Sequence, residues 1–378
     1  MRWVCHLKQI GLCGPKWTSL MYGMTAVRAM SVEGTGVRLS RIVEFLTSFA
    51  PLSLAESWDN VGLLVEPASP VLIKKVLLTI DLTEDVMKEA VDSKTNLIIA
   101  YHPPIFQPFK RITSGKWKER LLATCLENKM AVYSPHTTWD AVTGGLSDWL
   151  ASPFKFEGVE PLVPSLGVLT KPEFSHHVTV FCPLDLRNRC QEVIGRSHAD
   201  VVSTAELETM VKYSLVAKKQ FLLELESGLN ETNCYYSIYE RGPIPPRGCG
   251  TGRFGKLKSQ ITLSEAVEKV KALVGMSQIR LALQRGKTLD SPVRSVALVA
   301  GSGASVLRGV RADLYVTGEM LHHDILEANH SGASVILINH SDSERGYLSQ
   351  FAPRLADHFG DGIGVSIAAS DRDPIVIV

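Results

Sequence analysis

A histidine followed four residues later by a carboxylate occurs twice in the sequence, each time directly after a run of apolar residues. The first pair is His136 with Asp140, and the second is His340 with Glu344. Residues four apart share one face of a helix, so the two side chains of a pair can converge on one ion. Neutral imidazole and carboxylate together suit a divalent transition ion such as zinc, iron or manganese. The repetition at equivalent positions favours a metal site built by a duplicated unit.

Tyr101 and His102 form a third polar group, which follows the apolar run Asn96–Ala100. In open parallel sheets, ligands bind outside the carboxyl ends of the strands, where all three groups would lie. A carboxylate can also bridge two ions, an arrangement that activates water for hydrolysis. The alternative is that each histidine is an ordinary turn residue at the end of a strand, and this alternative stays open here.

Three other segments are weaker candidates. His322 and His323 are adjacent, so on a helix they point about 100° apart, and a structural role is favoured over shared metal binding. Gly301-Ser302-Gly303 lacks the third glycine of a dinucleotide fingerprint, which favours a tight turn over a phosphate site. The basic stretch Phe109–Arg120 reads as a solvated helix start rather than a phosphate-binding patch. No Ser-His-Asp order or reactive-cysteine signature supplies a nucleophile.

The elements that would position these residues alternate between strand and helix in two regions. Each region is expected to hold buried strands joined by helices, a pattern that predicts a parallel sheet with right-handed crossovers. The expected strands are 76–80, 96–100 and 130–133 in the first region, and 295–300, 313–317 and 334–339 in the second. The expected helices include 84–92, 117–128 and 321–330. The sequence therefore predicts an α/β fold with a duplication.

This pattern divides the chain into four parts. Residues 37–158 and 291–378 are expected to be two intertwined α/β halves with mostly parallel sheets. Residues 159–290 read as a smaller inserted α+β region with a linker. Residues 1–36 are expected to be a disordered or targeting extension. Within the inserted region the expected elements are strands at 176–181, 220–225 and 235–239 and a helix at 186–197.

Residues 1–32 contain four basic residues and no acid, the first carboxylate being Glu33. This composition is typical of a mitochondrial presequence, and it lacks the compact apolar run of a secretory signal. The alternative is a disordered extension with an internal start at Met21, Met24 or Met30. If the segment is a presequence, we expect a mitochondrial fraction of the protein.

Composition argues against several classes of protein. Hydrophobic residues make up 45% of the chain and charged residues 21%, values typical of a globular protein. The sequence contains no run of about 18 apolar residues, which is the length that would predict a membrane span. A formal net charge of +1 gives no strong nucleic-acid signal. The seven cysteines are widely spaced without a C-x-x-C pair, which argues against a zinc ribbon or disulfide framework and favours a reducing compartment.

Several motifs, in order along the chain, resemble the Nif-three family, whose bacterial members are labelled GTP cyclohydrolase type-two homologues. The matching segments of the N-terminal half are Trp58–Leu63, His102–Phe106, His136–Asp140 and Gly144-Gly145, and those of the C-terminal half are Thr317–Asp324 and His340–Gly346. The resemblance covers about residues 37–155 and 247–378 and is much weaker between them.

The resemblance implies a duplicated α/β fold, self-assembly into a homodimer or larger ring, and a two-metal site that faces an internal cavity. The ligands carried over by motif are His102, Asp140, His340 and Glu344. Eukaryotic members are linked to transcription regulators. The resemblance therefore also implies transcription-related regulatory proteins as partners, and the cytoplasm and nucleus as the location.

One position departs from the family pattern. Many members have two adjacent histidines where this chain has Tyr101-His102. A phenol, with a pKa of about 10, is a poorer metal ligand near neutral pH than the imidazole it replaces. We therefore predict that the protein holds one or two divalent ions, with weakened or absent occupancy at one of the two positions.

Two functions are consistent with these residues. The favoured one is a regulatory, partner-binding protein linked to transcription that retains a divalent metal site. The alternative is a metal-dependent hydrolase acting on a nucleotide-like or phosphorylated small molecule. The substitution at Tyr101 and the lack of a nucleophile favour the first, and four ligand-type residues at strand ends favour the second.

Overall fold

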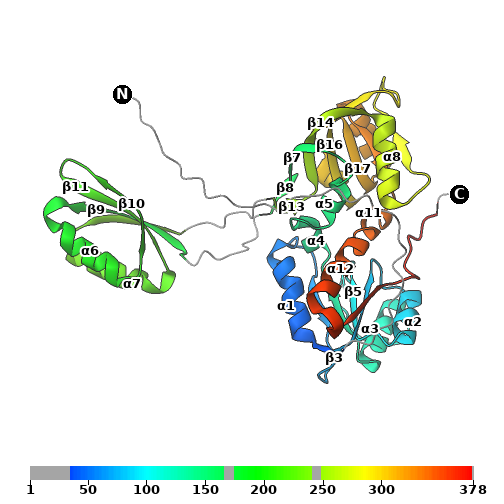
Figure 1. Ribbon diagram of the computed structural model, residues 1–378, viewed down its shortest axis with the longest axis horizontal. Coiled ribbons are helices and arrows are strands. Elements are labelled where there is room, and N and C mark those ends of the chain that lie inside the picture. Colours follow the sequence, from blue (N-terminus) through cyan, green and yellow to red (C-terminus); the bar gives the residue numbers. More distant parts are fainter. Residues whose placement is uncertain (1–34, 166–173, 241–247, 377–378) are drawn as a thin grey trace. The chain divides into compact units, whose positions relative to one another are not determined.

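The computed structural model describes residues 35–165, 174–240 and 248–376 (Figure 1). Residues 1–34, which include nearly all of the extension expected at 1–36, lie outside the described residues. The described strands form a five-stranded, a six-stranded and a four-stranded sheet, together with two short strand pairs. The expected α/β class is confirmed. None of the helices in the described ranges is both long and apolar enough to cross a membrane.

The five-stranded sheet holds three parallel strands where three were expected. They are β4 (Lys75–Thr79), β5 (Leu97–Ala100) and β6 (Ala131–Ser134). β19 (Gly364–Ile367) joins one edge parallel to β4, and β2 (Gly62–Val65) joins the other edge antiparallel to β6. β5 and β6 are buried along their whole length, which explains why the sequence shows them as unbroken apolar runs.

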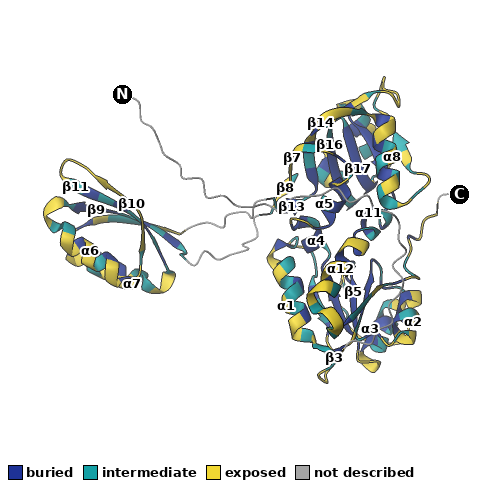
Figure 2. Ribbon diagram, in the orientation of Figure 1, coloured by how far each residue is buried: buried dark blue, intermediate teal, exposed yellow. Residues whose placement is uncertain are grey.

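Helices cover both faces of this sheet (Figures 1 and 2). α2 (Glu84–Asp92) and α3 (Trp117–Glu127) pack on one face, and α1 (Leu39–Phe49) and α12 (Leu348–Phe359) pack on the other. Both α12 and β19 come from the C-terminal part of the chain, so the last segment completes a sheet that the first segment begins. The two halves are intertwined in this sense.

The six-stranded sheet has the order β15-β18-β17-β16-β14-β7. Its central strands β16 (Pro292–Ser302), β17 (Leu314–Glu319) and β18 (Ser334–Leu337) are parallel, as expected. The short α9 (Ala304–Leu307) and α10 (His322–Ser331) pack on one face. α8 (Leu263–Val274) packs on the opposite face, in the core that this sheet shares with the first.

The flanking strands of the six-stranded sheet are antiparallel, so this sheet is mixed where a mostly parallel one was expected. β14 (Arg253–Thr262) pairs with β16, β7 (Phe156–Glu160) pairs with β14, and β15 (Arg280–Ala282) pairs with β18. β14 and β15 lie within residues 159–290, the range expected for the inserted region. Seven of the ten residues of β14 are exposed or partly exposed, so it does not show the unbroken apolar run by which parallel strands are found.

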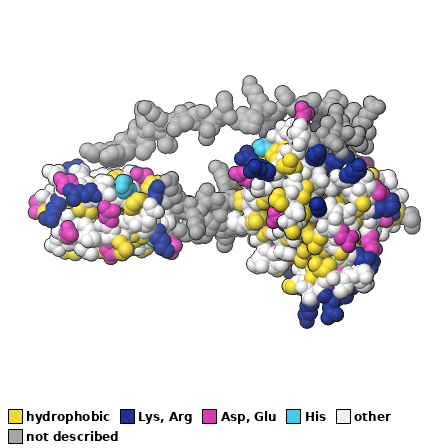
Figure 3. Space-filling view, turned by 90° about the horizontal axis from the view of Figure 1, so that it is seen from below, with side chains coloured by type: hydrophobic (Ala, Val, Ile, Leu, Met, Phe, Trp, Pro, Cys, Tyr) yellow, Lys and Arg dark blue, Asp and Glu magenta, His cyan; other side chains and the backbone are white. Residues whose placement is uncertain are grey.

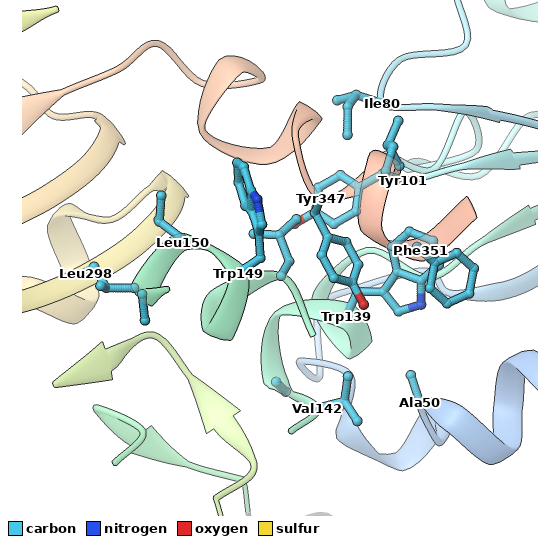
Figure 4. Packing of buried hydrophobic residues seen from close by; sticks show 14 of the residues in the cluster. Ala50, Ile80, Tyr101, Trp139, Val142, Trp149, Leu150, Leu298, Tyr347 and Phe351 are labelled. Atoms are coloured by element: carbon cyan, nitrogen blue, oxygen red, sulfur yellow. The ribbon is translucent and has the colours of Figure 1, made fainter. Parts of the chain in front are cut away.

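One hydrophobic core joins the two large sheets. It extends from α1 and β4 through α4 (Thr137–Ala141) and α5 (Leu146–Ala151) to β16. At its centre the ring of Trp139 lies 4.2 Å from that of Phe351 and 5.4 Å from that of Tyr347, measured between centroids (Figure 4). Trp139 is fully buried. It belongs to the first half of the chain and its two aromatic partners to the second, so this packing ties the halves together.

The middle of the chain forms the four-stranded antiparallel sheet, in the order β10-β11-β9-β12. Its two helices, α6 (Arg187–Arg196) and α7 (Leu222–Glu231), cover one face. The β-α-β-β-α-β succession is that of ferredoxin-like units, and the sheet has a hydrophobic core of its own. The strands are β9 (His176–Pro183), β10 (Asp200–Glu206), β11 (Met210–Ala217) and β12 (Tyr235–Glu240).

The strand expected at residues 220–225 is wrong, because the structure has a short 3-10 turn there that leads into α7. A short apolar run does not by itself distinguish a strand from a helix. Leu222, Leu225 and Leu229 recur at helical spacing and face the core of the four-stranded sheet. Their periodicity, extended beyond the apolar run, is the signal that identifies the helix.

The aromatic contact between the halves gives a stability prediction. Trp139→Ala should lower the free energy of unfolding by about 3–5 kcal/mol, since it leaves a large cavity in a core that both sheets share. Trp117→Ala is the matched control, because the Trp117 side chain is exposed, and it should change stability by no more than about 0.5 kcal/mol. Urea denaturation followed by circular dichroism measures both. Equal shifts would contradict the role given to Trp139.

Candidate metal centre

Three of the four predicted metal ligands meet where the two large sheets adjoin. His102 follows β5, His340 follows β18, and Glu344 lies on the short helix α11 (Asp342–Arg345). One nitrogen or oxygen atom of each residue lies within 4.8 Å of those of the other two. Residues from distant parts of the sequence therefore form one group at the carboxyl ends of strands, as expected for an open α/β sheet.

The Glu344 carboxylate lies between the two imidazoles. Its Oε2 is 3.4 Å from His102 Nε2, and its Oε1 is 3.4 Å from His340 Nε2. Two ligand atoms bound about 2.1 Å from one ion at a tetrahedral angle are about 3.4 Å apart. Each carboxylate oxygen is thus spaced from one imidazole as two ligands of the same ion would be. This is the arrangement of a carboxylate that bridges two cation positions.

The burial of Glu344 is a further reason to place a cation here. The residue is 2% exposed, and its Oε2 accepts no hydrogen bond from the described residues. A buried, ionised carboxylate without a hydrogen-bond partner costs several kcal/mol, on the order of the desolvation penalty of the ion, unless a positive charge compensates it. The donor set of imidazole and carboxylate therefore fits a divalent transition ion.

Each of the three histidines around this point is held by a carboxylate that the sequence analysis did not identify. The Nδ1 atom of His102 lies 3.0 Å from Asp81, that of His136 lies 2.7 Å from Asp59, and that of His340 lies 2.8 Å from Glu319. Metal-binding histidines commonly donate one ring N–H to a carboxylate, which orients the other nitrogen toward the ion. In all three residues Nε2 is therefore the ring nitrogen that can bind a metal ion.

These supporting carboxylates have a sequence signal that could have been used. Asp81 lies two residues beyond the end of β4, and Glu319 is the last residue of β17, so each lies at the carboxyl end of a parallel strand. The N-cap of α2 is Thr83, whose side chain accepts from the Val86 N–H, so the Asp81 carboxylate is not engaged as a helix cap. A carboxylate at a strand end beside a histidine at the next strand end is the pattern to look for.

His136 is close to the site although it is not among the predicted ligands. Its ring centroid is 5.4 Å from that of His102. Its φ of +33° lies in a region that residues other than glycine rarely adopt, and such strain is retained where the surroundings impose it. Here Asp59 accepts hydrogen bonds from His136 and from the hydroxyl and amide of Thr137.

Asp140, the fourth predicted ligand, lies in the same interior but is bound by Tyr101. The phenol of Tyr101 donates a hydrogen bond of 2.6 Å to Asp140 Oδ1. Burial raises the pKa of Asp140 to about 6, in spite of the lowering effect of Tyr101 and His136. Burial and the charge of Asp140 also raise the pKa of Tyr101 well above its ordinary value, so the phenol stays protonated. Tyr101 thus orients one oxygen of Asp140 and leaves the other available.

The charge around His102 is strongly negative. Burial by itself lowers the pKa of this imidazole, but the charge of Glu344 and the hydrogen bond to Asp81 outweigh it and raise the pKa to about 10. These carboxylates therefore attract a positive charge strongly. A divalent ion and a proton on His102 compete for the same electrostatic environment.

Gly301 provides space for the site. A Cβ atom at this position would lie 2.7 Å from Glu344 Oε1 and 3.0 Å from His340 Nε2. The Gly301 N–H donates to the Ser343 hydroxyl, so it is not directed toward a ligand. The glycine-containing segment 301–303 is therefore a close-packed turn, the interpretation favoured from the sequence over a phosphate site.

The other weak candidates lie apart from these residues. His322 and His323 are exposed at the start of α10, and Asp324 pairs with Arg308 at 2.9 Å. The basic stretch 109–120 forms an exposed loop and the start of α3, in which Arg120 pairs with Glu84. On the face drawn in Figure 3, basic and acidic side chains are interspersed. The structure thus places the histidine pair outside the metal-ligand group.

An aromatic rim borders the site on one side. The Trp58 ring centroid lies 5.8 Å from that of His136 and 6.0 Å from that of Phe106. Trp58 is 59% exposed, which is unusual for so large an apolar side chain, and Phe106 is also exposed. Phe106 lines a surface hollow together with Lys110, Arg111 and other residues of 104–120. The exposed rings of Trp58 and Phe106 therefore connect His136, beside the candidate metal centre, to the edge of this hollow.

Known proteins are similar to this chain in sequence and in fold. The family described as Duf34/NIF3 (NGG1p interacting factor 3) matches residues 37–374. NIF3-like protein 1 of Bos taurus is 41% identical over 348 residues, which are 90% of this chain and 92% of the relative. NGG1-interacting factor 3 of Saccharomyces cerevisiae is 29% identical over 361 residues, which are 92% of this chain and 100% of the relative.

A solved structure gives the same fold at lower sequence identity. The Staphylococcus aureus protein SA1388 superposes with a TM-score of 0.69 at 20% identity, over 91% of this chain and 99% of that protein. A sequence identity of 20% supports a shared fold and says nothing about a shared chemical activity. The α/β architecture is therefore supported by a structural likeness that is independent of the motifs around the site.

The carboxylate that holds His102 gives a prediction about metal affinity. Asp81→Asn should weaken zinc binding by about 10- to 100-fold, because the amide no longer fixes the charge and orientation of the imidazole. Asp85→Asn is the control, since Asp85 is an exposed residue of α2. Competition with a chromogenic zinc chelator at one fixed pH measures both. Equal affinities in the two variants would contradict the role of Asp81.

Proposed function

Because the chain belongs to the Duf34/NIF3 family, we propose that it is a regulatory, partner-binding protein linked to transcription, which holds a divalent metal between its two large sheets. The observation that carries the metal site is the buried Glu344 carboxylate with one oxygen toward each of two imidazoles. The name of the yeast relative, NGG1-interacting factor 3, supports a partner-binding role. Self-assembly into a homodimer or ring and a cytoplasmic and nuclear location are part of the same proposal.

The residues that would hold the ion follow from the contacts described above. His102 and His340 offer Nε2, Glu344 offers one oxygen to each side, and Asp140 offers the oxygen that Tyr101 does not occupy. His136 is a further imidazole beside them. A bound divalent ion of the zinc, iron or manganese type supplies positive charge that compensates Glu344 and lowers the pKa of a coordinated water.

Tyr101 supports the proposal that one of two metal positions is weakly occupied. The phenol is protonated and donates to Asp140, so it reduces the electron density that this carboxylate can give to a cation. The buried phenol itself is a poor ligand because ionising it would add a charge to an already negative interior. These effects act on the Asp140 side and leave the Glu344 side unchanged.

The alternative function is a metal-dependent hydrolase acting on a nucleotide-like or phosphorylated small molecule. Two observations favour it. Burial raises the pKa of Asp140 to about 6, which suits a proton acceptor near neutral pH. The exposed ring of Trp58 and the cations of the neighbouring hollow suit a ligand with an aromatic base and a phosphate.

The metal content of the protein tests whether Glu344 and the two imidazoles bind an ion. After removal of bound metal and reloading with zinc, the wild type should retain one to two ions per chain, and Glu344→Gln should lose at least one of them, because the amide brings no charge. Glu327→Gln on the exposed side of α10 is the control and should match the wild type. Equal zinc content in all three proteins would overturn the metal site.

The two functions are separated by the same variant. A regulatory protein should still co-purify with its transcription-related partners as Glu344→Gln, provided that circular dichroism shows the variant to be folded. For a hydrolase, turnover of nucleotides or phosphoesters by the zinc-loaded wild type should fall at least 100-fold in Glu344→Gln. Turnover in the wild type together with its loss in the variant would favour the alternative function.

The effect of Tyr101 can be measured by restoring the imidazole. Tyr101→His should raise the zinc content per chain, because it adds a neutral nitrogen ligand and frees Asp140 from the phenol. Tyr101→Phe is the control that removes the hydrogen bond without adding a ligand. Elemental analysis of the three proteins decides the point, and an unchanged zinc content in Tyr101→His would show that Tyr101 does not limit occupancy.

A further inference from the structure

A second group of metal-ligand atoms lies in the four-stranded sheet of the middle region. Cys182 is the last residue but one of β9, Cys190 lies on α6, and Cys234 directly precedes β12. All three are buried, and their sulfur atoms lie within 4.8 Å of one another. The three residues come from three different elements of one compact core, so their convergence is a product of the fold and not of a sequence motif.

The spacing of the three sulfurs fits a single ion. Three ligands arranged in a plane at about 2.3 Å from an ion, the length of a zinc–sulfur bond, are about 4.0 Å apart. The observed upper limit of 4.8 Å therefore requires only small side-chain adjustments. None of the five cysteines that the structure describes is in a disulfide, so all three thiols of the group are available.

The donors also indicate which ion would bind. In the part of the chain that the structure describes, this group contains sulfur ligands only, without a histidine or carboxylate. Soft thiolates select soft ions such as copper(I), whereas structural zinc sites almost always have four ligands. We propose that Cys182, Cys190 and Cys234 form a three-coordinate site for one copper(I) ion.

Binding at this site replaces sulfur–hydrogen bonds by sulfur–copper bonds. Burial raises the pKa of Cys182 to about 11 and that of Cys190 still further, so the thiols hold their protons in the absence of the ion. Each thiol that binds copper(I) releases one proton to the solvent and binds as the thiolate, and neither the metal nor the sulfur changes oxidation state. Only a strongly thiophilic ion displaces these protons at neutral pH.

Access to the site is through Cys234. Cys182 and Cys190 have no exposed surface, whereas Cys234 is 9% exposed in the turn between α7 and β12. The preceding residue, Asn233, has a φ of +54°, and Thr232 donates a hydrogen bond to the Cys234 sulfur at 3.3 Å. Cys234 is therefore the residue of the three that an ion approaching from the solvent meets first.

This site is chemically distinct from the candidate metal centre. That centre combines nitrogen and oxygen ligands, which suit zinc, iron or manganese, and it lies at the junction of the two large sheets. The cysteine group lies within the core of the four-stranded sheet. Loss of one site should therefore leave the other intact.

The test is a copper(I) titration of the reduced full-length chain, without oxygen, in competition with a chromogenic copper(I) chelator. We expect Cys190→Ser to bind one equivalent fewer than the wild type at the highest affinity, or to bind it at least tenfold more weakly. Cys125→Ser, which removes a buried thiol from another core, should match the wild type. Equal copper(I) binding by all three proteins would overturn the proposal.

Two further measurements keep the outcome clear. If Cys190→Ser does not fold, the folded wild type is labelled slowly with a thiol reagent, with and without copper(I), and each cysteine is quantified by mass spectrometry over time. Protection of Cys182, Cys190 and Cys234 relative to Cys125 supports the site, and equal labelling of all four overturns it. Zinc in place of copper(I) should give no comparable protection, and stronger protection by zinc would overturn the choice of ion.

Discussion

The structure around the junction of the two large sheets depends on one constraint, the burial of the Glu344 carboxylate. Such a carboxylate, with almost no exposure and one oxygen that accepts no hydrogen bond from the described residues, is stabilised only where positive charge lies beside it. The surroundings are arranged accordingly: two imidazoles face its two oxygens, a second layer of carboxylates orients those imidazoles, and a glycine leaves the room that they need. The site is therefore electrostatically complete only with a cation, whether a proton on histidine or a metal ion.

The same constraint explains why the halves of the chain cannot be regarded as independent domains. His102 belongs to the first sheet and Glu344 to the second, so the relative position of the sheets must be held to within tenths of an ångström. The shared core supplies this rigidity, with Trp139 from one half enclosed by Tyr347 and Phe351 from the other. Apolar packing thus fixes the relative position of the two sheets, and the contact between His102 and Glu344 depends on that position.

The sequence allowed much of this arrangement to be predicted, for reasons that can be traced to particular residues. The parallel strands were found because each is an unbroken apolar run, and His102, His340 and Glu344 because they follow such runs. Strand β14 was missed because it is only partly buried, and α7 because a short leucine-rich run suits either structure. Asp59, Asp81 and Glu319 were not assigned, because a position at a strand end suggests such a carboxylate but only the tertiary contact shows which histidine it supports. The grouping of three widely spaced cysteines is tertiary for the same reason.

The edge position of β19 has a consequence for the order in which the molecule forms. This strand, residues 364–367, pairs with β4, which begins at residue 75, and it does so only after nearly the whole chain has left the ribosome. During synthesis, β4 therefore lacks the neighbouring strand β19, and an unpaired strand edge can pair with other chains. Until residues 364–367 pair with β4, this edge of the sheet is open, so folding of the first sheet depends on a contact between segments almost 290 residues apart.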